Sequence, residues 1–271
     1  MTGRRSNQLS YYPKGTRGIS IRNKPFKSRN KGLNKIGYFD LTDFINLGEI
    51  YSTGKFIKMN NLRVKKLELG PISTNAFLLW EQGGKEAVLI DAPPSCASAI
   101  NPVLSENNLK LKEIWLTHGH WDHIAGVSEV MDDDTQVCGH PADELMFANP
   151  QLMAGFSIPG ISLLPVKIDQ WITDGVKISL WGREVLVLHC PGHCPGNVAF
   201  YIRDEEICFV GDVIFSGSIG RTDLPGGNFK ELEQSIQKKI YTLPDGTELG
   251  VGHGPNTTVG VEKMSNPYVR G

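Results

Sequence analysis

Short apolar runs separated by turn residues make up most of the chain after residue 61. Leu62–Leu69 alternates between apolar and polar positions, which predicts a strand with one solvated face. Asn75–Trp80 and Ala87–Asp91 are mostly apolar, which is typical of buried strands. Lys112–Leu116 predicts a further strand, and it ends directly before a cluster of polar side chains.

The second half of the chain repeats this pattern. Its short apolar runs each predict a strand: Thr135–Cys138, Val176–Leu180, Glu184–Leu188, Val198–Ile202, Ile207–Val210 and Thr247–Val251. Helices are predicted over Ala97–Asn107 with Ser95 as the N-cap, over Ile124–Val130 and over Glu231–Ile240. Strands that alternate with helices in two similar halves predict an α/β fold, with two packed sheets and helices outside them.

The composition is that of a soluble globular protein with one large α/β domain or two smaller ones. The chain has 271 residues, of which 40% are hydrophobic and 21% are charged. It contains no run of about 18 apolar residues, so we expect no membrane-spanning segment. Its five cysteines show no close-spaced framework, which favours the reducing cytoplasm over secretion.

Basic residues are concentrated at the N-terminus. Residues 1–39 contain ten Lys and Arg and no Asp or Glu, whereas the remainder contains 18 basic and 29 acidic residues. We therefore expect a poorly ordered basic extension over residues 1–58 and a catalytic domain over 59–271. Three other interpretations of the extension stay open: a segment that binds nucleic acid or an anionic surface, an organelle transit peptide, or sequence upstream of a true start at Met59.

The polar cluster after Lys112–Leu116 is rich in metal-binding side chains. Within six residues the chain places His118, His120, Asp122 and His123. Imidazoles and carboxylates together favour zinc as the bound metal, with iron or manganese as less favoured choices. Because so short a segment cannot wrap around one metal with all four ligands, the cluster predicts two adjacent metals that share them.

Three more candidate ligands follow short apolar strands and have glycine beside them or nearby in the loop. They are His193, Asp212 and His253, and glycine lets the backbone approach a metal closely. We expect His140 to have a loop or capping role. The thiols of Cys190 and Cys194 flank His193, and we expect them to be loop thiols and not ligands.

The motif His-x-His-x-Asp-His, with the later His193, Asp212 and His253, resembles the metallo-β-lactamase fold of dinuclear hydrolases. This resemblance implies a four-layer αββα sandwich of two mixed β-sheets with helices outside. It also implies that His118, His120 and His193 hold a first metal. A second metal is implied on Asp122, His123 and His253, with Asp212 as the bridge between the two.

The same resemblance assigns supporting and catalytic roles. Asp91 matches an aspartate at the end of a strand that supports the ligand loop, and His189 matches a histidine that is more structural than ligating. Asp122, His123 and Asp212 are the implied catalytic residues. Two divalent cations at such a site lower the pKa of a shared water toward about 7, which supplies hydroxide as the nucleophile.

The segment Gly217–Asp223 resembles a loop of glyoxalase II-like thioesterases and of the related persulfide dioxygenases. Arg221 and Asp223 are therefore candidate substrate-binding residues, with a loop-stabilising ion pair as the alternative. Only 18 residues follow His253, so the helical region with which glyoxalase II binds glutathione is not expected. The chain is most similar to the short, hydroxyacylglutathione hydrolase-like branch.

These observations predict a metal-dependent hydrolase that cleaves a small-molecule thioester such as an S-acylglutathione. Its cofactors would be two divalent metal ions, with zinc favoured over iron or manganese. One alternative is a persulfide dioxygenase with a single Fe(II). Another is a nucleic-acid-associated protein that uses the basic extension, although nucleic acid is the less favoured partner. Formation of a homo-oligomer stays open.

Overall fold

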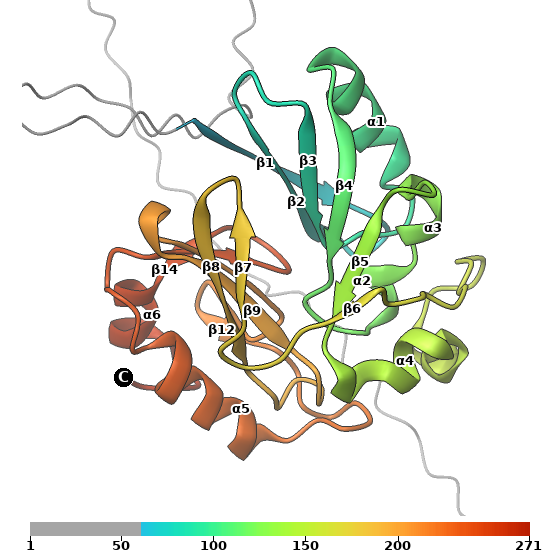
Figure 1. Ribbon diagram of the computed structural model, residues 1–271. Helices are drawn as coiled ribbons and strands as arrows, with labels where there is room; N and C mark the ends of the chain where they lie inside the picture. The colour runs from blue at the N-terminus through green and yellow to red at the C-terminus, as the bar shows by residue number, and fades with distance from the viewer. Residues whose placement is uncertain (1–60) are drawn as a thin grey trace, which may run out of the picture. The chain divides into compact units, whose positions relative to one another are not determined.

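Two six-stranded sheets pack against each other, and helices cover their outer faces (Figure 1). The computed structural model describes residues 61–271, which all belong to one compact unit. The layers follow the order helix, sheet, sheet, helix, so the predicted αββα sandwich is confirmed. The predicted extension over 1–58 lies outside the described residues. Among the described helices, none combines the length and the apolarity that crossing a membrane requires.

The first sheet is built from the first half of the described chain, and its strands lie in sequence order. Its members are β1 (Leu62–Leu69), β2 (Thr74–Glu81), β3 (Glu86–Ile90), β4 (Lys110–Trp115), β5 (Gln136–Gly139) and β6 (Gln170–Trp171). The pairs β1–β2 and β2–β3 are antiparallel, and the pairs from β3 to β6 are parallel. The sheet is therefore mixed, with the carboxyl ends of β3, β4 and β5 along one edge.

The second sheet is also mixed and has the order β14-β13-β10-β9-β8-β7. Its members are β7 (Lys177–Leu180), β8 (Arg183–His189), β9 (Val198–Ile202), β10 (Ile207–Gly211), β13 (Glu248–Val251) and β14 (Thr257–Thr258). Only β10 and β13 pair in parallel. A separate hairpin is formed by β11 (Ile214–Phe215) and β12 (Ser218–Ile219).

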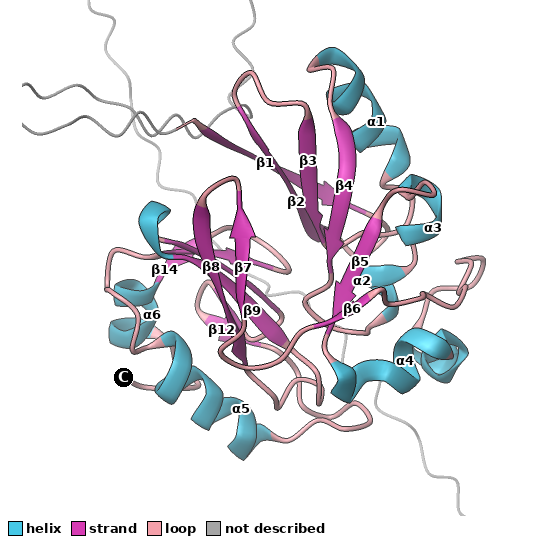
Figure 2. Ribbon diagram, viewed as in Figure 1, coloured by secondary structure: helices cyan, strands magenta, loops and turns pink. Residues whose placement is uncertain are grey.

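The helices are short and lie outside the sheets (Figure 2). They are α1 (Ala97–Glu106), α2 (Trp121–Ile124), α3 (Val127–Val130), α4 (Glu144–Ala148), α5 (Phe229–Ser235) and α6 (Val259–Ser265), with 3₁₀ turns η1 (Pro141–Asp143), η2 (Pro150–Phe156) and η3 (Arg203–Glu205) and a π-helical turn η4 (Ile236–Ile240). The predicted helix over Ile124–Val130 is thus two separate turns. The predicted Ser95 cap is wrong, because Cys96 occupies the N-cap position of α1. The carboxylate of Glu129 instead accepts hydrogen bonds from the N–H groups of Ser95 and Ala97.

Three apolar layers hold the sandwich together, one under each set of helices and one between the sheets. The layer between the sheets contains two aromatic pairs. Trp115 of β4 meets Phe200 of β9 with ring centroids 5.3 Å apart, and Phe77 of β2 meets Phe209 of β10 at 4.8 Å. Each pair joins one strand of each sheet, so together they fix how the two ligand-bearing edges face each other.

Phe200→Ala is expected to destabilise the fold by about 3–5 kcal/mol, because it leaves a cavity between the sheets. Urea unfolding followed by circular dichroism measures the loss. Phe156→Ala is the matched control, since its side chain is 49% exposed and the cost should stay within about 0.5 kcal/mol. Equal losses in the two variants would contradict this account of the sandwich.

Candidate metal centre

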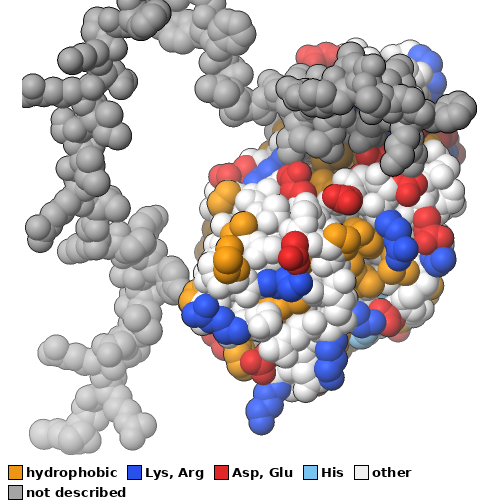
Figure 3. All heavy atoms as spheres, turned by 90° about the vertical axis from the view of Figure 1, so that its left-hand side faces the viewer, with side chains coloured by type: hydrophobic (Ala, Val, Ile, Leu, Met, Phe, Trp, Pro, Cys, Tyr) orange, Lys and Arg blue, Asp and Glu red, His pale blue; other side chains and the backbone are white. Residues whose placement is uncertain are grey.

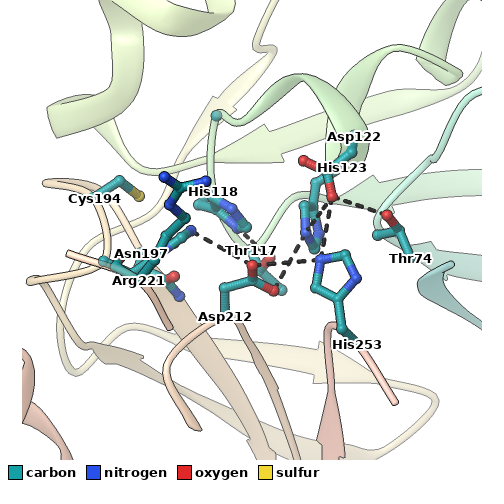
Figure 4. Close-up of polar contacts among 12 residues, drawn as sticks. Thr74, Thr117, His118, Asp122, His123, Cys194, Asn197, Asp212, Arg221 and His253 are labelled. Carbon is teal, nitrogen blue, oxygen red and sulfur yellow. Dashed lines mark hydrogen bonds and ion pairs between the residues drawn. The ribbon is translucent and has the colours of Figure 1, made fainter. Parts of the chain in front are cut away.

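All seven predicted metal ligands meet at the edge where the strands of both sheets end. His118 and His120 lie in the loop after β4, Asp122 and His123 on α2, His193 between β8 and β9, Asp212 after β10, and His253 after β13. The side chains come from chain segments up to 135 residues apart in sequence. Figure 4 shows His123, Asp212 and His253 facing one another, with Thr74 beside Asp122.

Six of the seven ligands fall into two triads among the described residues, and a third group, His118, His123 and Asp212, overlaps both. The first triad is His118, His120 and His193, and the second triad is Asp122, His123 and His253. In each triad the possible ligand atoms lie within 4.8 Å of one another, and only His253 is partly exposed. These are the two sets that the sequence resemblance implies. That they hold metal remains a prediction.

Asp212 lies between the two triads. Its Oδ2 is 3.5 Å from Nε2 of His193, in the first triad, and 3.5 Å from Nε2 of His253, in the second. Its Oδ1 is 3.4 Å from Nε2 of His123. One carboxylate is therefore placed to serve cations at both triads, as a bridging ligand must.

The donor atoms of the site fit divalent cations. Buried atoms without a hydrogen-bond partner are Nε2 of His118, His120, His123 and His193 and Oδ1 of Asp212. At least three of these atoms face an oppositely charged group, but Nε2 of His118 and of His120 does not. A buried polar atom left unpaired costs about 1–3 kcal/mol, so the site calls for a ligand. Imidazole nitrogen and carboxylate oxygen are donors that zinc, iron and manganese accept.

The protonation of the histidines differs between the triads. Burial and the neighbouring His193 lower the pKa of His120 to about 3, and burial with the nearby His123 holds the pKa of His118 well below its usual range. Burial also opposes protonation of His253, yet the Asp212 carboxylate raises its pKa to about 10. His118 and His120 are thus neutral. In the second triad, by contrast, the imidazoles lie against carboxylates.

Asp91 supports both the ligand loop and one ligand ring. It follows β3 with a left-handed backbone (φ 59°), and its carboxylate accepts hydrogen bonds from the N–H and the hydroxyl of Thr117, both at 2.8 Å. Its Oδ2 also lies 2.7 Å from Nδ1 of His123. The ring of His123 is therefore held with Nε2 toward Asp122 and Asp212, which is the supporting position expected for Asp91.

The predicted substrate residues lie at the surface. Arg221 and Asp223 form an ion pair at 2.7 Å, with side chains 60% and 70% exposed. The carbonyl oxygen of Arg221 points the other way and lies 2.7 Å from Nδ1 of His193. The structure therefore gives the loop a role in orienting His193, and substrate contact by these two side chains remains a prediction.

The remaining two histidines lie outside both triads. Nε2 of His189 is 2.8 Å from the carbonyl oxygen of Pro195, and its ring stacks on His140 with centroids 3.9 Å apart. Nδ1 of His140 accepts a hydrogen bond from the N–H of Ala142 at the start of η1. The capping role predicted for His140 is confirmed, and His189 braces the loop that carries His193.

Three supporting residues were missed from the sequence. Thr74 donates its hydroxyl hydrogen bond to Oδ2 of Asp122 at 2.8 Å. Asn75 donates to the carbonyl oxygens of Val251 and Gly254, on either side of His253. Asp143 accepts hydrogen bonds from two ligand loops. A single threonine, asparagine or aspartate has no spacing pattern, so nothing in the sequence marks these residues.

Two glycines are required by the closeness of the backbone to the ligands. A Cβ at position 252 would lie 2.0 Å from Oδ1 of Asp212. A Cβ at position 220 would lie 1.9 Å from the carbonyl oxygen of Asp212 and 3.0 Å from Nδ1 of His193. Any larger residue at Gly220 or Gly252 would displace the central carboxylate.

The sequence profile of the Metallo-beta-lactamase superfamily matches residues 69–253, a span that contains all seven ligands. The chain belongs to this superfamily. The superfamily binds divalent metals, and the two triads provide a site for them. Neither the identity nor the number of the metals follows from this membership.

Two curated relatives match the chain over almost their whole length. It is 35% identical to the probable metallo-hydrolase YqgX of Bacillus subtilis over 211 residues, which cover 78% of this chain and 99% of that protein. It is also 35% identical to the hydroxyacylglutathione hydrolase GloC of Haemophilus influenzae over 211 residues, which cover 75% of this chain and 97% of GloC.

Two solved structures share the fold at similar identity. BLEG-1, described as a B3 metallo-beta-lactamase, is 38% identical with a TM-score of 0.69. The matched region covers 77% of this chain and 100% of the BLEG-1 chain. TTHA1623, solved in a di-iron-bound form, is 35% identical with a TM-score of 0.65. The matched region covers 75% of this chain and 99% of the TTHA1623 chain.

Asp91→Asn is expected to weaken metal binding about 10–100-fold, because the amide has one accepting atom and cannot accept from the Thr117 N–H on one side and from His123 on the other. Asn keeps the size of the side chain and tolerates the left-handed backbone. Competition of the metal-free protein against a chromophoric chelator measures the affinity. Asp245→Asn is the control, since it breaks only the exposed ion pair with Lys263. An unchanged affinity in Asp91→Asn would contradict the supporting role.

Proposed function

We propose that the protein is a dinuclear metal-dependent hydrolase that cleaves a thioester such as an S-acylglutathione. The observation that carries the proposal is the position of Asp212 between two complete triads. A single-metal site needs neither the second triad nor a carboxylate shared between the two. Membership of a superfamily of metal-binding proteins supports the hydrolase class.

Bound at this site, two divalent cations would lower the pKa of a shared water and stabilise the negative charge that develops on the acyl oxygen. The residues of the chain hold that arrangement in place. His118, His120 and His193 would hold one cation, and Asp122, His123 and His253 the other. Asp122, His123 and Asp212 would orient the attacking water between the triads, which makes them the catalytic residues of the proposal.

The thioester class is supported by similarity to one named relative. GloC, named a hydroxyacylglutathione hydrolase, matches over 97% of its length at 35% identity. Residues Gly217–Asp223 also resemble the loop of thioesterases of this type, and Arg221 of that loop reaches the surface beside the site. An exposed guanidinium is suited to a carboxylate of the thiol carrier.

β-Lactam hydrolysis is a second candidate, because BLEG-1 is 38% identical over its whole length. A β-lactam and a thioester are both attacked by water at an acyl carbon, so the two triads suit either substrate. The persulfide dioxygenase alternative would use a single iron on histidines of the first triad and Asp212, with oxygen, and would not need the second triad.

The protein, purified without chelator, is expected to contain about two metals per chain and to release free thiol from S-lactoylglutathione. Elemental analysis and a thiol-reactive dye measure the two quantities. Hydrolysis of a chromogenic cephalosporin with no thioester turnover would favour the second candidate. A single iron per chain with oxygen uptake on glutathione persulfide would overturn the hydrolase.

His120→Ala is the control variant for that experiment. It removes one ligand of the first triad, so turnover should fall by more than about 100-fold, while the circular dichroism spectrum stays that of the parent. Unchanged turnover in this variant would place the chemistry elsewhere.

Deletion of residues 1–39 is expected to leave thioester turnover intact, because all proposed ligands lie in the described part of the chain. On the face seen in Figure 3, Lys and Arg side chains of the described residues are interspersed with Asp and Glu and do not gather into one basic patch. Binding of duplex DNA or RNA at several salt concentrations tests the nucleic-acid alternative. Steeply salt-dependent binding that the deletion abolishes would support that alternative.

We also propose a reducing compartment such as the cytoplasm. All five cysteines are free thiols and all five are buried, and buried unpaired cysteines are typical of proteins from reducing environments.

A further inference from the structure

Asp143 lies between the two loops that carry the first triad. It is the last residue of η1, and its side chain is completely buried. Its Oδ2 accepts hydrogen bonds from the N–H of Gly119 at 2.9 Å and from the thiol of Cys194 at 3.2 Å. Its Oδ1 accepts one from the N–H of Gly196 at 2.6 Å. All three donors are thus supplied by ligand loops.

The hydrogen-bond donors to Asp143 are close in sequence to the ligands of the first triad. Gly119 separates His118 from His120, and Cys194 directly follows His193. The first triad is assembled from these two loops, and the carboxylate of Asp143 is hydrogen-bonded to both. Its position therefore sets the distance between His193 and the other two ligands.

The second triad has different supports. Asp122 accepts from Thr74, and His123 is held by Asp91. Among the hydrogen bonds of residues 61–271, none joins Asp143 to a residue of the second triad. A change at Asp143 should therefore act on one metal position and leave the other alone.

Asp143 does not cap the helix that follows it. Asp143 is the N-cap residue of α4, yet its side chain makes no capping hydrogen bond. An N-cap aspartate usually contributes about 1 kcal/mol through that bond. The side chain turns to the ligand loops instead, although burial raises the pKa of its carboxyl and so disfavours the ionised form.

The surrounding side chains are matched to this contact. A Cβ at Gly196 would lie 2.4 Å from Cγ of Asp143, so only glycine lets the backbone approach. The thiol of Cys194 is completely buried and donates to the same carboxylate at 3.2 Å.

We propose that Asp143 is a positioning residue that joins the two loops of the first triad and sets the metal affinity of that triad alone. The inference rests on the proposed function in that the triads are taken to hold metal. It does not depend on which substrate is cleaved.

Asp143→Asn in the full-length chain tests the proposal, with Co(II) as the probe and its visible absorption as the readout. The amide keeps the size of the side chain but cannot accept from donors on both of its sides. Each position is isolated in a parent variant: His253→Ala leaves the first triad complete, and His120→Ala leaves the second. We expect Asp143→Asn to weaken Co(II) binding about 10–100-fold in the His253→Ala parent and less than about 3-fold in the His120→Ala parent.

Thr74→Val is the matched control, because it removes the hydrogen bond to Asp122 and should give the reverse pattern. Cys194→Ala removes one donor of three, and a smaller loss confined to the His253→Ala parent is expected. Cys194→Ser keeps a donor and should restore most of the affinity.

Equal losses of Co(II) affinity in both parents would indicate a general effect on the fold and would overturn the proposal. An unchanged affinity in both parents would also overturn it. If Asp143→Asn fails to fold, the Cys194 pair decides by the same criterion. Failure of the parent chain to bind Co(II) would overturn the proposed function and this inference together. Two bound metals with no response to Asp143→Asn or Cys194→Ala would overturn the inference alone.

Discussion

The burial of ionisable side chains at one edge of the sandwich is the constraint that governs this structure. Removing an imidazole or a carboxylate from water is costly unless it is paired. Most of that pairing is internal to the site: Asp91 and Asp122 lie against His123, and Asp212 lies against His253. In the first triad, Nε2 of His193 is 3.5 Å from Oδ2 of Asp212, whereas Nε2 of His118 and of His120 has no hydrogen-bond partner. A divalent cation would supply the missing partner.

This division explains why the two triads need different scaffolds. The second triad contains the carboxylate of Asp122 and lies against that of Asp212, and both attract its imidazoles, so part of its geometry is fixed by charges within the site. The first triad consists of three imidazoles, and two of them are neutral because of burial. The three rings meet edge to face, and a hydrogen-bonded brace from outside the triad holds the loops that carry them. Asp143 and the stacked pair of His140 and His189 lie where that brace is needed.

The sequence predicted the parts of the molecule that repeat or cluster. The strand predicted over Leu62–Leu69 has the same bounds as β1, although its burial does not alternate. The clustered histidines indicated the site because such spacing is rare by chance. The two-residue strands β6 and β14 were missed because two residues carry no period. Thr74 and Asp143 were missed because each acts through contacts with residues distant in sequence, which only the folded chain brings near.

The loop Gly217–Asp223 faces the site with its backbone and solvent with its charged side chains. The carbonyl of Arg221 faces His193, whereas its guanidinium faces solvent with Asp223. Substitution of the side chain leaves the carbonyl in place, so the metal ligand and the surface charge can change independently. The glycine before it cannot change, since a Cβ at Gly220 would meet the carbonyl of Asp212. The side chains of Arg221 and Asp223 are therefore free to vary, while the backbone of the loop keeps the orientation of His193.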